Sequence, residues 1–143
     1  MHKQKVITHS ENMKKYVHLD MKGGPPRLEY LLSLLPMFRD WGATGLLVEW
    51  EDMFPWSGSL SCLARPGHYT PAMVEQLLAL ADTLGMDVIP LIQTFGHMEF
   101  VLKHDQFKHL RDIGRYPNCV RPLCVDTETR DVESLVSEMI HRL

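Results

Sequence analysis

The feature that most constrains this chain is an alternation of strand-like and helix-like stretches, repeated three times. Three short apolar stretches predict strands. Between and after them, apolar residues recur at the three- and four-residue spacing of a helix. The predicted strands are 16–21, 44–50 and 87–93, and the predicted helices are 27–41, 70–85, 105–113 and 129–143. Strands that alternate with helices are typical of parallel strands joined by crossover helices, so the sequence predicts an α/β fold.

Residues that mark helix ends support these boundaries. In the stretch 70–85, Thr70 is a suitable N-cap, Pro71 fits the first helical position, and Gly85 lies past the end. In the first predicted helix, Pro36 is expected to bend or weaken the helix, because proline lacks the backbone N–H that an interior position donates.

Composition argues against several classes of function. The formal net charge is −3 and the basic residues are scattered, which gives no basis for binding nucleic acid or an anionic membrane surface. No stretch approaches the ~20 apolar residues of a transmembrane helix, and no signal-peptide core is seen. Three cysteines, Cys62, Cys119 and Cys124, do not suggest a disulfide framework. We expect a protein of the cytoplasm or nucleus, with a loose tail at 1–15 and one domain at 16–143.

Polar side chains accompany the end of each predicted strand, at the edge where the carboxyl ends of parallel strands meet. Functional groups of parallel α/β folds gather at this edge, which we call the rim. The rim residues are Asp20 and Lys22, then Glu49, Glu51 and Asp52 with Phe54 and Trp56, then Gln93, His97 and Glu99. Carboxylates accept hydrogen bonds from hydroxyls, and aromatic rings stack on sugar carbons. The rim therefore suits a small polar ligand such as a sugar.

Several rim residues also have a purely structural interpretation. Glu49, inside an apolar strand, fits a salt bridge at the core edge as well as a hydrogen-bond acceptor for ligand. Glu51 and Asp52 are most simply a solvated loop start, although Asp52 is within reach of a ligand. Asp20 fits a cap for the next loop or a sugar-binding group, and its place at a strand end favours the second.

The remaining rim residues have two interpretations as well. Trp56 fits stacking on a sugar, but packing within the long loop 51–69 explains it equally well. Taken alone, His97 and Glu99 are most simply the start of a helix, where the helix dipole favours an acidic residue.

A metal site is a weaker interpretation of the histidines. His97, Glu99, His104 and His109 are close in sequence but do not form an HExxH motif, and the spacing of the last two does not place both on one helical face. The chain carries neither a motif for a nucleophilic triad nor a glycine-rich phosphate loop. We expect no metal and no cofactor.

Three stretches together resemble glycoside hydrolase family 20: VHLDMKGGPP, GLLVEWEDMFPW and VIPLIQTFGHMEFVLKH. The resemblance runs from about Tyr16 to the C-terminus. It implies a (β/α)8 TIM barrel, of which this chain supplies the first three βα units. It also implies a β-N-acetylhexosaminidase that releases terminal N-acetylgalactosamine or N-acetylglucosamine from a glycan or glycoconjugate and needs no metal.

The mechanism that the resemblance implies is substrate-assisted retention. The 2-acetamido oxygen of the substrate attacks the anomeric carbon, an Asp orients that group, and a Glu protonates the leaving oxygen. In the family this Asp and Glu are adjacent and lie at the end of the fourth strand, but this sequence contains no Asp-Glu dipeptide. Glu51 and Asp52 have the reverse order after the second strand and are not assigned that role. The catalytic pair is therefore expected beyond Leu143, and this chain is expected to be inactive alone.

By the same resemblance, His97 lines the active-site rim and hydrogen-bonds near the acid pair. Lys22 stands where other members carry a sugar-clamping Arg, and Leu91 and Gln93 stand where they carry carboxylates, so the preferred aminosugar stays open. The residues expected to bind substrate are Asp20, Lys22, Glu49, Asp52, Gln93, His97 and Glu99. A homodimer of the full-length parent also stays open.

Two other classes of protein remain open: a non-catalytic carbohydrate-binding or interaction module, and a self-contained small α/β domain of another enzyme class. Three strands of a barrel would leave two open sheet edges and uncovered apolar faces. We therefore expect aggregation or partial folding of the chain when it is expressed alone.

Overall fold

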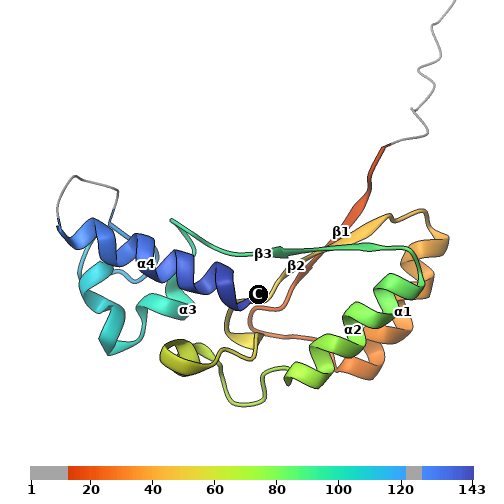
Figure 1. Cartoon of the computed structure of the whole chain (residues 1–143), viewed down its shortest axis with the longest axis horizontal. Coiled ribbons are helices and arrows are strands. Elements are labelled where there is room, and N and C mark those ends of the chain that lie inside the picture. Colours follow the sequence, from red (N-terminus) through yellow and green to blue (C-terminus); the bar gives the residue numbers. More distant parts are fainter. Residues whose placement is uncertain (1–12, 122–126) are drawn as a thin grey trace, which may run out of the picture.

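The computed structural model describes residues 13–121 and 127–143, and Figure 1 shows a small sheet with helices on one face and beyond one end of its strands. The strands are β1 (Tyr16–Asp20), β2 (Gly45–Glu49) and β3 (Asp87–Leu91). The α-helices are α1 (Leu28–Asp40), α2 (Pro71–Thr83), α3 (Glu99–Leu102) and α4 (Thr127–Arg142). Three short 3-10 helices complete the described elements: η1 (Glu51–Met53), η2 (Gly58–Leu63) and η3 (Asp105–Leu110).

The three strands form one open sheet in the order β1-β2-β3, and both pairs of neighbours are parallel. The predicted α/β fold with parallel strands is therefore confirmed. The register places Asp20, Glu49 and Leu91 side by side, so the carboxyl ends of all three strands lie at one edge of the sheet.

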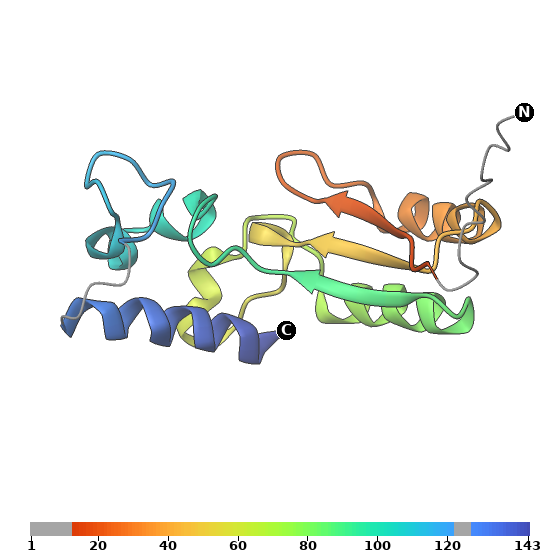
Figure 2. The same ribbon diagram turned by 90° about the horizontal axis from the view of Figure 1, so that it is seen from above.

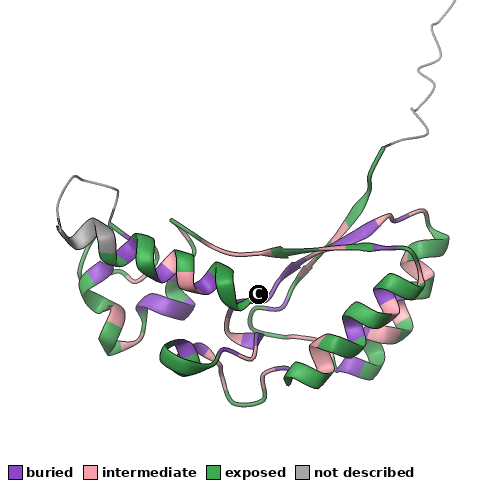
Figure 3. Cartoon of the chain, in the orientation of Figure 1, coloured by how far each residue is buried: buried purple, intermediate pink, exposed green. Residues whose placement is uncertain are grey.

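One face of the sheet is covered by α1 and α2, and the other is open (Figure 1). Successive residues of a strand point to opposite faces. Leu46 and Val48 of β2 are fully buried in the core, which also contains Leu31 of α1 and Leu77 of α2. On the opposite face Ile89 stays 43% exposed, because no described element covers it. Figure 3 shows buried residues where the sheet meets the two helices and in the segments beyond the strand ends.

The helix-end signals are confirmed for α2. The Thr70 side chain accepts a hydrogen bond from the backbone N–H of Met73 at 3.3 Å, as an N-cap does. Gly85 follows the helix with a φ of 62°, a left-handed conformation that costs a glycine little. Helix α1 continues through Pro36 without a break, so the expected weakening does not divide the helix.

The segment 51–69, predicted as a long loop, packs into the core. It forms η1 and η2, and its apolar residues Met53, Phe54, Trp56, Leu60, Leu63 and Tyr69 are buried. The ring of Phe54 lies 4.9 Å from that of Trp56, and the ring of Trp56 lies 6.5 Å from that of Phe100. Trp56 is 5% exposed, so it packs within the protein. Outside η1 and η2, the segment is ordered by the burial of these aromatic side chains.

Helix α4 lies beyond the carboxyl ends of the strands, as Figures 1 and 2 both show. Polar contacts join it to η2 and to the residue before it: Arg142 Nη1 donates to Ser57 Oγ at 3.1 Å, and the Ser59 hydroxyl donates to the Glu138 carboxylate. The predicted helix 105–113 is the 3-10 helix η3, which ends at Leu110.

Two predictions fall partly outside the described residues. Of the tail predicted at 1–15, residues 13–15 are exposed and carry no regular secondary structure, and residues 1–12 are not described. Cys124 is not described either. Among the helices of the described chain, none combines the length and the apolar character that crossing a membrane requires.

Gly45 is the point where the side chains of the outer strands meet across β2. The Tyr16 hydroxyl donates to Asp87 Oδ2 at 2.9 Å, so the tyrosine ring passes directly over Gly45. A Cβ at Gly45 would lie 2.5 Å from Tyr16 Cε1 and 2.6 Å from the carbonyl oxygen of Asp87. Only glycine allows this approach without a shift of the backbone.

Gly45→Ala is expected to lower the free energy of unfolding by about 1–3 kcal/mol, because the methyl group forces strand and ring apart. Gly114→Ala is the matched control, since a Cβ there meets no atom within 4 Å. Urea denaturation of both variants checks the prediction. Equal stability of the two would show that Tyr16 does not lie over Gly45 in solution.

Candidate functional site

Five polar side chains meet at the carboxyl edge of the sheet: His18, Lys22, Glu49, Glu51 and Gln93. We call this group the strand-end cluster. His18 is in β1, Lys22 follows β1, Glu49 ends β2, and Gln93 lies two residues past β3. The parallel register brings them together, because the three strands end at the same level. Lys22, Glu49 and Gln93 of this cluster are among the predicted ligand-binding residues.

Glu49 is at the centre of the cluster and is only 6% exposed. Its Oε2 lies 3.0 Å from His18 Nε2, and its Oε1 accepts a hydrogen bond from Gln93 Nε2 at 2.6 Å. Lys22 Nζ is 3.8 Å from the same Oε1. Both carboxylate oxygens are therefore engaged by partners from β1 and from the segments that follow β1 and β3, which is the pairing that a buried carboxylate needs.

The prediction that Glu51 is solvated is wrong, because Glu51 is only 6% exposed. Its backbone has a φ of 45°, which is left-handed and unusual for a residue other than glycine. The Trp56 indole N–H donates to the Glu51 carbonyl at 2.7 Å, and Lys22 Nζ lies 2.9 Å from Glu51 Oε1. The turn thus points the carboxylate at the ammonium of Lys22.

The burial of Glu51 changes the proton affinity of the pair. Desolvation raises the pKa of Glu51, and the neighbouring Lys22 ammonium opposes this rise. Contact with the Glu51 carboxylate in turn raises the pKa of Lys22, because it stabilises the charged amine. Lys22 therefore carries its charge throughout the physiological pH range.

Asp52 points to a different partner from Glu51. Its side chain is 15% exposed, and Lys103 Nζ lies 3.2 Å from its Oδ2. The prediction of a solvated carboxylate is therefore also wrong for Asp52. Glu51 thus connects η1 to the loop after β1 through Lys22. Asp52 connects η1 to Lys103, the residue that follows α3.

The other predicted rim residues lie at the surface. Asp20 Oδ1 accepts the backbone N–H of Lys22 at 2.9 Å, so Asp20 caps the loop while its side chain remains exposed. His97 is exposed with a left-handed φ of 57°, and Glu99 is the exposed first residue of α3. In residues 13–121 and the described part of α4, no hydrogen bond or ion pair joins His97 or Glu99 to the strand-end cluster.

Two cluster residues, His18 and Glu51, were not predicted to bind ligand. His18 lies two residues before Asp20, and the strand period of two places both on the same face, so the pattern contained a signal for it. Glu51 was recognised as a rim residue but interpreted as solvated, because the direction of its side chain depends on a left-handed backbone angle. Among the described side chains, no three histidine, cysteine or acidic groups lie close enough together to hold a metal ion.

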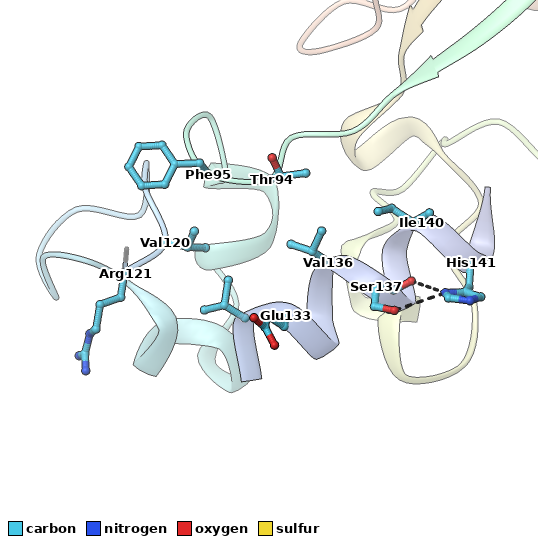
Figure 4. A pocket seen from close by; sticks show the side chains of 10 residues that line it. Thr94, Phe95, Val120, Arg121, Glu133, Val136, Ser137, Ile140 and His141 are labelled. Carbon is cyan, nitrogen blue, oxygen red and sulfur yellow. Dashed lines mark hydrogen bonds between the residues drawn. The ribbon is translucent and has the colours of Figure 1, made fainter. Parts of the chain in front are cut away.

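A groove of about 570 Å³ lies between α4 and the loop after β3 (Figure 4). Its lining is mainly apolar and includes Phe95, Val120, Val136 and Ile140. Near one end, His141 Nδ1 lies 2.6 Å from the carbonyl oxygen of Ser137. No residue of the strand-end cluster lines the groove, so its apolar surface and the polar chemistry of the rim are separate.

The raised pKa of Glu51 predicts a pH-dependent stability. Between the ordinary carboxyl range and that raised value, the folded state binds a proton that the unfolded chain has released, so stability falls as pH rises through this window. Glu51→Gln lacks this titration. The free energy of unfolding of the wild type minus that of Glu51→Gln should fall as pH rises from about 4 and then level off.

Urea denaturation of both proteins at matched pH values measures this difference. A difference that stays constant from acid to neutral pH would mean that Glu51 is not buried in solution.

No protein-family model matches this chain. Hexosaminidase D of Bos taurus is 50% identical over 108 residues, which cover 76% of this chain and 31% of the cow protein. Hexosaminidase D of Homo sapiens is 51% identical over 108 residues, covering 76% of this chain and 22% of the human protein.

The chain thus spans less than a third of the length of either relative. Identity at this level over three quarters of the chain does not arise from a shared fold alone, since one fold hosts many unrelated sequences. The chain is a hexosaminidase D-like protein.

Proposed function

We propose that the rim is part of the sugar-binding site of a β-N-acetylhexosaminidase of glycoside hydrolase family 20. The single observation that carries the proposal is the strand-end cluster, in which three parallel strands bring two buried carboxylates, a lysine, a histidine and an amide together. Half identity to two hexosaminidase D proteins supports it. The ligand proposed is a glycan that ends in N-acetylgalactosamine or N-acetylglucosamine.

The partly exposed members of the rim supply the groups that a sugar can reach. The side chains of His18 and Lys22 are 50% and 44% exposed, and Asp20 and His97 are exposed. Together they offer N–H donors and a carboxylate acceptor, which match hydroxyl and acetamido groups. The buried Glu49 and Glu51 hold two of the donors, His18 and Lys22, in place. A sheet with helices on one face is also compatible with part of a (β/α)8 barrel, whose ligands bind at this edge.

We further propose that this chain binds an aminosugar and does not hydrolyse it. Substrate-assisted hydrolysis in family 20 uses an adjacent Asp-Glu pair, and the sequence has no such dipeptide. Of the acids at the rim, Glu49, Glu51 and Asp52 are each paired with a cation or an amide, and Asp20 accepts a backbone N–H of its own loop. A carboxylate held in this way is poorly suited to deliver a proton to a leaving group.

Incubation of the 143-residue chain with p-nitrophenyl N-acetyl-β-D-galactosaminide is expected to release no p-nitrophenol above the uncatalysed rate. In an NMR titration, methyl N-acetyl-β-D-galactosaminide is expected to shift amide signals of residues at the strand ends. Binding without turnover supports the proposal. Turnover would contradict the claim of inactivity, and absence of binding would contradict the sugar site.

Two variants of His97 distinguish the effect of its imidazole on sugar binding from the effect of its backbone conformation on stability. His97→Gly removes the imidazole and fits the φ of 57°, whereas His97→Ala removes the same group and keeps the left-handed strain. Both variants are expected to bind the methyl glycoside about threefold to tenfold more weakly, as expected for one lost hydrogen bond. His97→Ala is expected to be less stable than His97→Gly by about 1 kcal/mol.

The same NMR titration and urea denaturation measure these two effects. Glu75→Gln, an exposed change on α2, is the control for both. Unchanged sugar affinity in the two His97 variants would remove His97 from the site.

A further inference from the structure

The turn η1 buries a carboxylate that the sequence predicted to be solvated. Glu51 has a left-handed backbone, and its side chain is buried. The carbonyl of Glu51 is held by the Trp56 indole, and the neighbouring Asp52 is held by Lys103. A left-handed non-glycine residue is strained and persists only where its surroundings determine it. The contacts of the Glu51 carbonyl and of Asp52 therefore fix the direction of the Glu51 side chain.

The fixed carboxylate in turn determines where the ammonium of Lys22 lies. Lys22 is in a loop with two glycines after it, Gly23 and Gly24, and a lysine side chain has many rotamers. Its Nζ lies 2.9 Å from Glu51 Oε1 but 3.8 Å from Glu49 Oε1, so Glu51 is the closer partner. The side chain is 44% exposed, which leaves part of the ammonium open to a ligand.

Three carboxylates share this one ammonium. Asp20 of β1 and Glu49 of β2 both act on Lys22 in addition to Glu51. The same two acids and Lys22 are the charged groups that act on Glu51. Without the Glu51 charge, the ammonium would be drawn towards Glu49 and Asp20, because it would keep only those two attractions. That shift would move its N–H groups relative to the rim.

We propose that Glu51 is a positioning residue that holds the Lys22 ammonium at the strand ends, where it donates to an oxygen of the bound aminosugar. The inference rests on the proposed sugar-binding function. Glu51 itself is buried beneath Lys22 and does not touch the ligand. Its effect on affinity therefore passes entirely through Lys22.

This arrangement makes sugar binding depend on pH in a specific way. Burial raises the pKa of Glu51, so this carboxyl gains a proton at a higher pH than an exposed one as the solution is acidified. The protonated acid no longer attracts the ammonium, and affinity falls. Other groups at the rim titrate as well, so the contribution of Glu51 is the difference between the pH profiles of the wild type and Glu51→Gln.

The experiment is a double-variant cycle in the 143-residue chain with methyl N-acetyl-β-D-galactosaminide as the probe. The affinity is measured by NMR titration for the wild type, Glu51→Gln, Lys22→Met and the double variant. Each single change is expected to weaken binding about tenfold, the loss of one charge-assisted hydrogen bond. The double variant is expected to bind no more weakly than Lys22→Met. Glu75→Gln is the control and should bind as the wild type does.

The pH profile of the wild type, compared with that of Glu51→Gln, tests the same inference by titrating the carboxyl group in place. Its affinity should decline on acidification in a step that Glu51→Gln lacks.

Equal affinity of the wild type and Glu51→Gln would overturn the inference and leave the proposed function standing. A further loss on adding Glu51→Gln to Lys22→Met would also overturn it, since Glu51 would then act on the ligand directly. Absence of binding by the wild type would overturn the proposed function, and the inference with it.

Discussion

Two carboxylates buried at the end of one strand are the constraint on which the rest of the rim depends. A buried charge without a partner costs several kcal/mol, so Glu49 and Glu51 must be met by donors. β2 itself supplies none. The donors come from either side, His18 and Lys22 from the first βα unit and Gln93 from the third. Satisfying the central acids therefore ties the three strand ends together.

The open face of the sheet makes this polar arrangement possible. Glu49 lies on the face that α1 and α2 do not cover, where loop side chains can reach it. On the covered face, the same level of the sheet is filled by Val48, which is fully buried. At the opposite end of the strands, Gly45 lets the Tyr16 side chain reach Asp87 and closes the sheet there. The sheet is thus held at both ends by side-chain contacts that cross β2.

The sequence predicted those parts of the fold that depend on local periodicity. The three strands, α2 with its Thr70 cap, and the gathering of polar residues at the strand ends all follow from spacing within short windows. The packing of the segment 51–69 did not follow, because its aromatic residues bury against partners such as Phe100 that are distant in the chain. The burial of Glu51 was not predicted for a similar reason, since it depends on a backbone angle and on a lysine from another βα unit.

Both left-handed non-glycine residues of the described chain occur in the loops after β2 and β3. The first, Glu51, is fixed by Trp56 and Lys22. The second, His97, is followed by Met98, which is fully buried and donates its backbone N–H to the Asn118 carbonyl at 3.1 Å. In each loop, contacts with residues further along the chain or in another segment hold the left-handed residue or its neighbour in place.

Strain held in this way has a consequence for binding. A loop that is already fixed loses little conformational freedom when a ligand arrives, so less of the interaction energy is spent on ordering it. The burial of Trp56 and Met98, one in each loop, stabilises these loops in the folded protein and offsets the strain of the left-handed residues. The rim is therefore organised before any ligand binds, and its polar groups keep their places because apolar side chains beneath them are packed.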